Sequence, residues 1–118
     1  MNKTIAGYHL LMILSAVDFR VAGAEDTVIR QYLVDEFPFN VNLDRQMEVI
    51  SRLKPDEWEG HFLKAMDDFY DDATEAERRN LIKFALALAK ADNVITKEEN
   101  HYLNLLFENW EETTQGNL

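Results

Sequence analysis

Two stretches of this chain repeat one arrangement of acidic residues, and closely placed carboxylates are typical ligands of hard cations. In each stretch an Asp is followed three residues later by a β-branched apolar residue and seven residues later by a Glu. The acids are Asp18 and Glu25 in the first stretch, and Asp92 and Glu99 in the second. Four neighbouring carboxylates would repel one another, and a divalent cation would relieve that repulsion. Because all the ligands are oxygens, the pattern predicts Ca²⁺ or Mg²⁺ at these residues.

The same acids also have a purely structural interpretation. A Glu in the first turn of a helix is favoured by the positive helix end and can complete a capping box. An Asp at the end of the preceding helix can accept hydrogen bonds from the backbone just beyond it, as in an Asx turn. The sequence leaves both interpretations open, and it does not show whether the two stretches meet in space.

Helices are the elements expected to position these acids. The chain has 118 residues with only four glycines and two prolines, too few for a fold rich in turns, and 47% of its residues are hydrophobic. Apolar residues recur every three or four positions, which is the spacing of one helix face. We therefore predict an all-α fold, a single-domain bundle of about six helices over residues 1–118. The expected helices run from Lys3 to Phe19 and from Ala24 to Phe37, and then begin near Asn42, Pro55, Thr74 and Thr96.

Local signals mark the starts of these helices. Asn42 is a typical N-cap, and Pro55 fits a first helical turn, where its missing N–H has no partner to lose. Thr74 and Glu77 match the capping-box pattern, as do the residues at the start of the sixth helix. Asp92 lies 74 residues after Asp18, and the same shift aligns the apolar positions around both. We therefore predict an internal repeat of one helical pair.

The helical periodicity also predicts which residues are buried. The first helix should bury one face, the second should bury Val28, and the third should bury a stripe that includes Met47. The residues expected to face the core are Leu10, Leu11, Leu14, Val17, Val28, Ile29, Tyr32, Leu33, Leu43, Met47, Ile50, Leu53, Trp58, Phe62, Met66, Phe69, Leu81, Phe84, Ala85, Leu88, Tyr102, Leu103, Leu106, Phe107 and Trp110.

The charge balance narrows the classes of partner. The chain has 22 acidic residues against 12 Lys and Arg, a formal net charge of −10. Such a surface repels nucleic acids and anionic membranes, so we expect neither as a partner. The absence of cysteine excludes disulfides and thiolate metal sites and fits a cytoplasmic protein. The apolar run after Lys3 has some features of a secretory signal, but His9, Asp18 and Arg20 interrupt that pattern.

The segment AKADNVITKEENHYLNLLF, which begins at Ala89, resembles the signature of the tellurite-resistance TerB-like family. That signature is an Ala-rich helix end, an Asp, usually a Gly, a β-branched residue and an acid-rich capping box. The first copy, LSAVDFRVAGAEDTVIRQYL, is a weaker version. Asn93 stands where Gly is usual, and Asn also accepts the left-handed conformation. The first copy departs further from the family pattern, because it has Phe19 in the position of the usual Gly and Ala22 in place of a polar N-cap.

The resemblance implies an all-helical domain over most of the chain and a cytoplasmic, stress-associated module whose acidic corners chelate metal. It implies no known reaction. The second corner matches the pattern better than the first. Carried onto this sequence, the implied ligands are Asp92, Glu99, Asp18 and Glu25, with Glu98 as a neighbour.

Other clusters are weaker candidates. The stretch MDDFYDDATEAE lacks the alternating ligands and central Gly of a calcium EF-hand loop, so we interpret its acids as exposed helix residues before a capped turn. Glu98 and His101 have the spacing of a di-iron bundle motif, but no second copy accompanies them. His61 and Glu57 lie four residues apart, which is typical of a surface pair. The one basic cluster consists of Arg78, Arg79 and Lys83.

We therefore expect a non-enzymatic acidic module in a stress response of the tellurite-resistance type, binding a divalent cation and acting through a protein partner. A homodimer is left open. The alternative is a metal-free protein–protein interaction module whose acids only cap helices. A metal-dependent hydrolase is a third interpretation, and it would need a water-accessible cation beside a pocket. No nucleophile with a neighbouring base and no phosphate-binding loop favours an enzyme.

Overall fold

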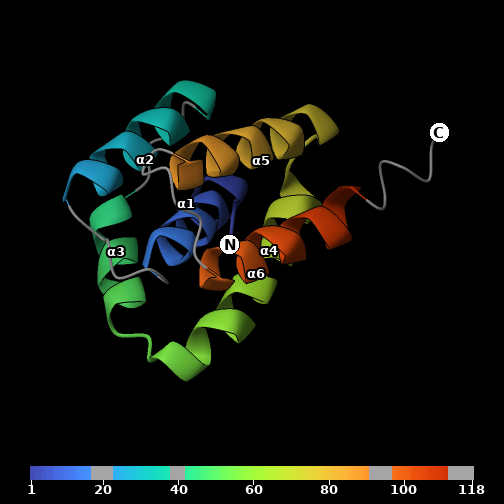
Figure 1. The fold of residues 1–118 in the computed structure, drawn as a ribbon. Coiled ribbons are helices and arrows are strands. Elements are labelled where there is room, and N and C mark those ends of the chain that lie inside the picture. The colour runs from blue at the N-terminus through green and yellow to red at the C-terminus, as the bar shows by residue number, and fades with distance from the viewer. Residues whose placement is uncertain (17–22, 38–41, 91–96, 112–118) are drawn as a thin grey trace.

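The computed structural model describes residues 1–16, 23–37, 42–90 and 97–111, and these residues form helices joined by short connections (Figure 1). No strand occurs within these ranges. The prediction of an all-α fold of about six helices is confirmed. None of the described helices is both long and apolar enough to cross a membrane. The elements are α1 (Lys3–Ala16), α2 (Gly23–Glu36), α3 (Leu43–Ser51), the 3₁₀ turn η1 (Pro55–Glu57), α4 (Trp58–Asp72), α5 (Glu75–Lys90), α6 (Lys97–Leu106) and the π-helical turn η2 (Phe107–Glu111).

Helix α1 is the central helix of the fold. It contacts α2, α3, α4, α5 and α6, which surround it in Figure 1. The prediction that α1 buries a single face is wrong, because Tyr8, Met12 and Ile13 are as deeply buried as Leu10 and Leu14. A helix that is apolar on all sides belongs in the interior rather than at the surface. The long apolar run near the N-terminus is therefore explained by burial on every side.

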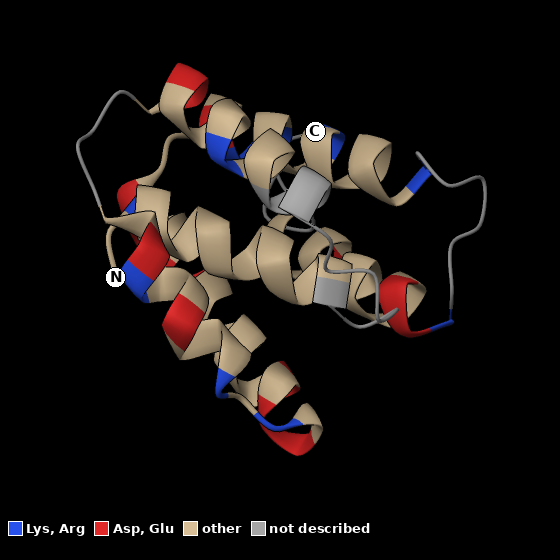
Figure 2. Ribbon diagram, turned by 90° about the vertical axis from the view of Figure 1, so that its left-hand side faces the viewer, with Lys and Arg blue, Asp and Glu red and all other residues tan. Residues whose placement is uncertain are grey.

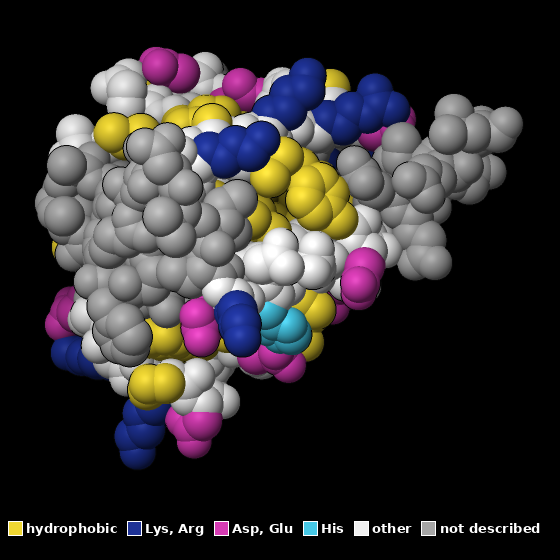
Figure 3. Space-filling view, viewed as in Figure 1, with side chains coloured by type: hydrophobic (Ala, Val, Ile, Leu, Met, Phe, Trp, Pro, Cys, Tyr) yellow, Lys and Arg dark blue, Asp and Glu magenta, His cyan; other side chains and the backbone are white. Residues whose placement is uncertain are grey.

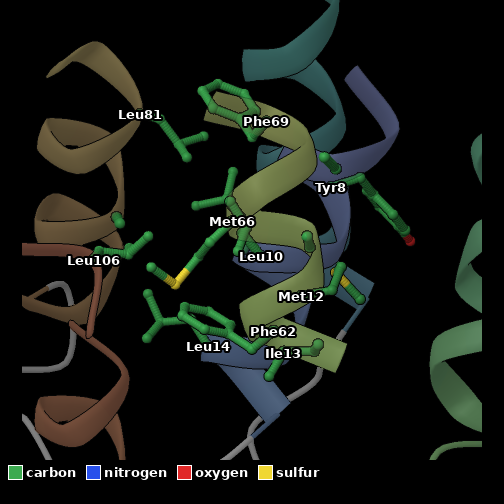
Figure 4. Packing of buried hydrophobic residues seen from close by; sticks show 14 of the residues in the cluster. Tyr8, Leu10, Met12, Ile13, Leu14, Phe62, Met66, Phe69, Leu81 and Leu106 are labelled. Carbon is green, nitrogen blue, oxygen red and sulfur yellow. The ribbon is translucent and has the colours of Figure 1, made fainter. Parts of the chain in front are cut away.

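The core forms where α1 and α4 face each other, with α5 and α6 closing one side (Figure 4). Phe69 of α4 is fully buried, stacks on Trp110 with 5.4 Å between ring centroids, and meets Phe37 edge to face at 5.9 Å. These two contacts join the C-terminal turn η2 and the end of α2 to the Phe69 ring of α4. The side chains that converge in Figure 4 include Leu10, Leu14, Phe62, Met66, Phe69, Leu81 and Leu106.

Two residues expected in the core lie at the surface instead. Val28 is 48% exposed and Met47 is 38% exposed. Helix α2 reaches the core through Ile29, next to Val28, and α3 does so near its two ends, through Leu43 and Ile50. Periodicity locates an apolar stripe but not its width, and these two residues fall at the edges. The expected core residues that are only partly buried are Tyr32, Leu53, Trp58, Phe84, Leu88 and Phe107.

The predicted helix starts are confirmed in three places. The Asn42 side chain accepts a hydrogen bond from the Arg45 N–H at 3.3 Å. The capping box of α5 is complete: the Thr74 N–H donates to Glu77 Oε1 at 2.8 Å, and the Glu77 N–H donates to Thr74 Oγ1 at 3.1 Å. Pro55 opens the 3₁₀ turn that leads into α4. At these three starts the backbone N–H groups find a local acceptor or, at Pro55, need none.

Candidate functional site

The second acidic corner lies between α5 and α6. Asp92, together with Thr96, falls in the connection 91–96, outside the described residues. Glu98 and Glu99 form the first turn of α6, where Figure 2 shows acidic residues at the helix start. Their side chains differ sharply, because Glu98 is exposed whereas Glu99 keeps only 4% of its accessible surface.

The burial of Glu99 is unusual for a carboxylate, because removing a charge from water is costly unless other groups compensate it. The positive end of α6 favours a negative charge in the first turn. Burial also weakens the screening of charge by water, so a cation or a hydrogen-bond donor near Glu99 would interact with it strongly. The position suits a cation ligand and suits a helix cap.

The first acidic corner lies largely outside the described residues. Asp18 belongs to the segment 17–22, and Glu25 lies on α2 with a side chain that is not described. The internal helical-pair repeat is therefore not confirmed, since the acids that define it fall in these gaps. Among the described residues, no group of three or more His, Asp or Glu side chains is arranged to hold a metal ion. The five predicted ligands stay predictions.

Two other glutamates cap helices in the way that the structural interpretation expects. Glu77 completes the box of α5, and Glu57 Oε1 accepts from the Lys54 N–H at 2.8 Å. Glu77 also accepts from Lys3 Nζ at 2.9 Å. Burial by itself would raise the pKa of Glu77, but the bonds from Thr74 and Lys3 lower it overall. Glu77 is thus held as a carboxylate between α1 and α5.

The acid-rich stretch of α4 binds the beginning of the chain (Figure 2). The ammonium group of Met1 lies 3.1 Å from Asp68 Oδ2, and the Lys3 N–H donates to Asp72 Oδ2 at 2.9 Å. The hydrogen bond from the terminal ammonium lowers the pKa of Asp68. These acids were predicted to be exposed helix residues, and part of the stretch instead attaches α1 to α4.

A pair of histidines inside the fold was not predicted as a unit. His9 of α1 is 2% exposed, and its Nδ1 lies 2.5 Å from Nε2 of His61 on α4. On its other side, His9 Nε2 lies 2.7 Å from Gln46 Oε1 on α3. His61 was interpreted only as one of a surface pair with Glu57; the charge of Glu57 does act on it, but its ring also faces His9. One signal was available, since a His inside an apolar run needs a buried partner.

Both histidines are held neutral. Burial is the largest effect and lowers the pKa of His9 and of His61. The hydrogen bond with Gln46 at His9 and the charge of Glu57 at His61 act in the opposite direction, but both pKa values stay lowered. An amide oxygen can only accept, so the Nε2–H of His9 donates to Gln46. The Nδ1 of His9 then accepts from the Nε2–H of His61. This chain of two hydrogen bonds joins α4, α1 and α3 without a net charge.

His101 does not act with Glu98 in the spacing of a di-iron motif. Its Nε2 instead contacts Glu59 Oε1 of α4, and both side chains are about half exposed. This contact joins the start of α4 to α6 at the surface. Exposed pairs of this kind contribute little to stability.

Comparison with known proteins agrees with the family resemblance of the acidic corner. The family model described as tellurite resistance protein TerB matches residues 4–108. This chain belongs to the TerB family. The TerB match spans the described helices from the first turn of α1 to the start of η2. Searches of curated proteins and of solved structures each found no match to this TerB chain.

Proposed function

We propose that this TerB-family chain is a non-enzymatic helical module that binds one divalent cation, Ca²⁺ or Mg²⁺, at the corner between α5 and α6. The observation that supports this most is the burial of Glu99 in the first turn of α6. Glu99 would bind the ion together with Asp92, and Glu98 would lie beside them. Asp18 and Glu25 are proposed as a second, weaker pair of ligands.

The chemistry of these ligands favours a hard cation. Carboxylate oxygens match Ca²⁺ and Mg²⁺, and no cysteine is present to favour a soft metal. A buried carboxylate at a helix start is already oriented, so binding would cost little side-chain entropy. The net charge of −10 would further raise the local concentration of cations.

In the cell, we propose that the module acts in the cytoplasm in a stress response of the tellurite-resistance type. It would act by contacting another protein rather than by catalysis. Family membership supports the link to tellurite resistance through the family's own description. The bound ion would fix the α5–α6 corner and so the surface on either side of it.

Stability measurements test the proposal. Chelator-treated protein should unfold at a higher temperature when Ca²⁺ or Mg²⁺ is added, and an ion at one hundred times its dissociation constant adds about 2.7 kcal/mol. The double variant Asp92→Asn, Glu99→Gln should lose this gain. The matched control is Asp67→Asn, Asp71→Asn, which removes two exposed acids from α4. If the added ion raises the unfolding temperature equally in both variants, the ion binds at a site other than the α5–α6 corner.

A metal-free interaction module is the second candidate, and the caps formed by Glu77 and Glu57 favour it. In that case Glu99 would only complete a box with Thr96. Glu99→Ala would then lower the free energy of unfolding by about 1 kcal/mol, as loss of a cap does, with and without divalent ions alike.

A further inference from the structure

A groove lies between α5 and the C-terminal turn η2, with a volume of about 260 Å³. This is smaller than the roughly 300–1,000 Å³ of typical small-molecule sites. Figure 3 shows hydrophobic side chains gathered between Lys and Arg side chains on this face. The lining residues are Glu75, Arg78, Arg79, Ile82, Lys83, Leu86, Phe107 and Trp110.

Two parallel rows of α5 build one wall of the groove. Ile82 and Leu86 follow Arg78 at intervals of four residues and form an apolar row, while Arg79 and Lys83 form the charged row beside it. Residues four apart lie on one helix face. Ile82 and Leu86 are about 6 Å apart along the helix axis, and with Arg78 the row spans about 12 Å, which is about two turns of another helix.

The opposite wall and the floor are aromatic. Trp110 is 3% exposed and stacks on Phe69, so it is fixed by the core, while Phe107 is only partly buried. Ile82 is also held in the core, and Leu86 remains partly accessible. The groove therefore exposes parts of ordered apolar side chains that an inserted side chain could cover without reorganising the fold.

The rim is basic, although the chain as a whole is strongly acidic. Arg78 is fixed by a bond to the Ala73 carbonyl at 2.9 Å and lies over the Tyr70 ring at 4.0 Å. Arg79 pairs with Glu75 at 2.8 Å, but both side chains are about half exposed, so the pair is weak. Lys83 is exposed and makes no ion pair with any residue in the described ranges.

We propose that this groove binds an acidic amphipathic helix of a partner protein. Two apolar side chains of that helix, three or four residues apart, would enter between Leu86 and Phe107, in the manner of helix-in-groove recognition. Acidic residues on its flank would pair with Arg79 and Lys83. A nucleic acid fits poorly, because an apolar floor offers nothing to phosphates and the net charge repels them. The proposal is independent of the cation site.

The test uses a fluorescent panel of short helical peptides with two leucines four residues apart. One set has glutamates on the flank, the matched set has lysines, and a scrambled set serves as reference. Anisotropy titrations should show saturable binding of the acidic set only. The variant Arg79→Glu, Lys83→Glu should weaken that binding by at least about tenfold, because both charge contacts become repulsive.

Two controls keep the test specific. Lys54→Glu makes the same kind of charge change on an exposed residue outside the groove, and binding should be unchanged. Leu86→Asp should abolish binding, with circular dichroism checking that the fold is kept. Equal binding of acidic and basic peptides, or no binding of any peptide at about 1 mM, would overturn the proposal.

Other occupants would also be visible. Sedimentation that shows a dimer dissociated by Leu86→Asp, without peptide binding, would mean that a second copy fills the groove. Peptide binding that appears only after residues 112–118 are removed would mean that the chain's own tail is the occupant. Either result would overturn the proposal of a partner helix. Neither result depends on whether Glu99 binds an ion, so the two proposals can fail separately.

Discussion

His9 Nδ1 and His61 Nε2 lie 2.5 Å apart and join α1 to α4 within the protein. Because one ring must donate and the other accept, this contact exists only while one of the two facing nitrogens is unprotonated. Protonation of both rings would place two positive charges against each other with little water between them. The contact between the two central helices is therefore linked to pH.

We predict that the free energy of unfolding falls as the pH drops below about 6.5, the ordinary pKa of His. The folded state lowers the pKa of both rings, so the unfolded chain takes up protons first and is stabilised by acid. Stability is full above this pH and is lost progressively as the pH falls toward the folded-state values. Denaturant unfolding measured at intervals of about 1 pH unit from pH 8 to pH 5 gives the free energy of unfolding at each pH.

The charges around this pair oppose one another. Glu57 favours protonation of His61, while Lys64 and, at His9, the terminal ammonium disfavour it. His61→Gln should remove part of the pH dependence, because an amide N–H can still donate to His9 but cannot titrate. The control His101→Gln changes an exposed ring, and the pH dependence that His9 and His61 cause should remain. If the free energy of unfolding of the unmodified chain does not change with pH over this range, the pH dependence assigned to His9 and His61 is contradicted.

Two glycines should respond differently to the same substitution. At Gly7 an added Cβ would lie 3.2 Å from Leu33 Cδ2 and 3.3 Å from Phe69 Cε2, whereas at Gly60 no atom lies within 4 Å. Gly60→Ala should stabilise the protein by about 0.5–1 kcal/mol, the gain in helix propensity. Gly7→Ala should fall short of that gain or destabilise, since the buried side chains of Leu33 and Phe69 must shift by a few tenths of an ångström to make room. An equal rise in the unfolding temperature of both variants would contradict the close packing at Gly7.

Glu77 should contribute more to stability than any exposed acid of the same region. Glu77→Ala removes the bond that the Glu77 side chain makes in the capping box of α5, and it removes the ion pair with Lys3, so we expect a loss of about 1–2 kcal/mol. The matched control Asp71→Ala removes an exposed acid of α4 and should change stability by less than about 0.5 kcal/mol. Urea denaturation of both variants gives the comparison. Similar losses would mean that Glu77 does not join the helices.

Local chemistry made the helix starts predictable, because a cap and the N–H it satisfies lie within three residues. Asn42 with Arg45, and Thr74 with Glu77, could therefore be identified from sequence. The hydrogen bond of His9 could not, because its partner His61 is 52 residues away and only tertiary packing brings them together.

The surface positions of Val28 and Met47 show a second limit of sequence patterns. An apolar residue at the edge of a helical stripe is buried only if a neighbouring element covers it, and periodicity does not say how far that cover extends. The same reasoning explains α1, whose burial on several sides depends on the five helices that contact it. The groove at α5 follows this logic too, since Phe107 and Trp110 could be predicted to face the core but not to line a groove beside the basic residues of α5.

The most direct test of the proposed function is a calorimetric titration of chelator-stripped protein with Ca²⁺, Mg²⁺ and, for comparison, Zn²⁺. We predict saturable binding of a hard cation that is abolished by Asp92→Asn, Glu99→Gln and retained by Asp67→Asn, Asp71→Asn. Absence of binding up to about 1 mM ion, or equal binding by both variants, would contradict a cation site at the α5–α6 corner.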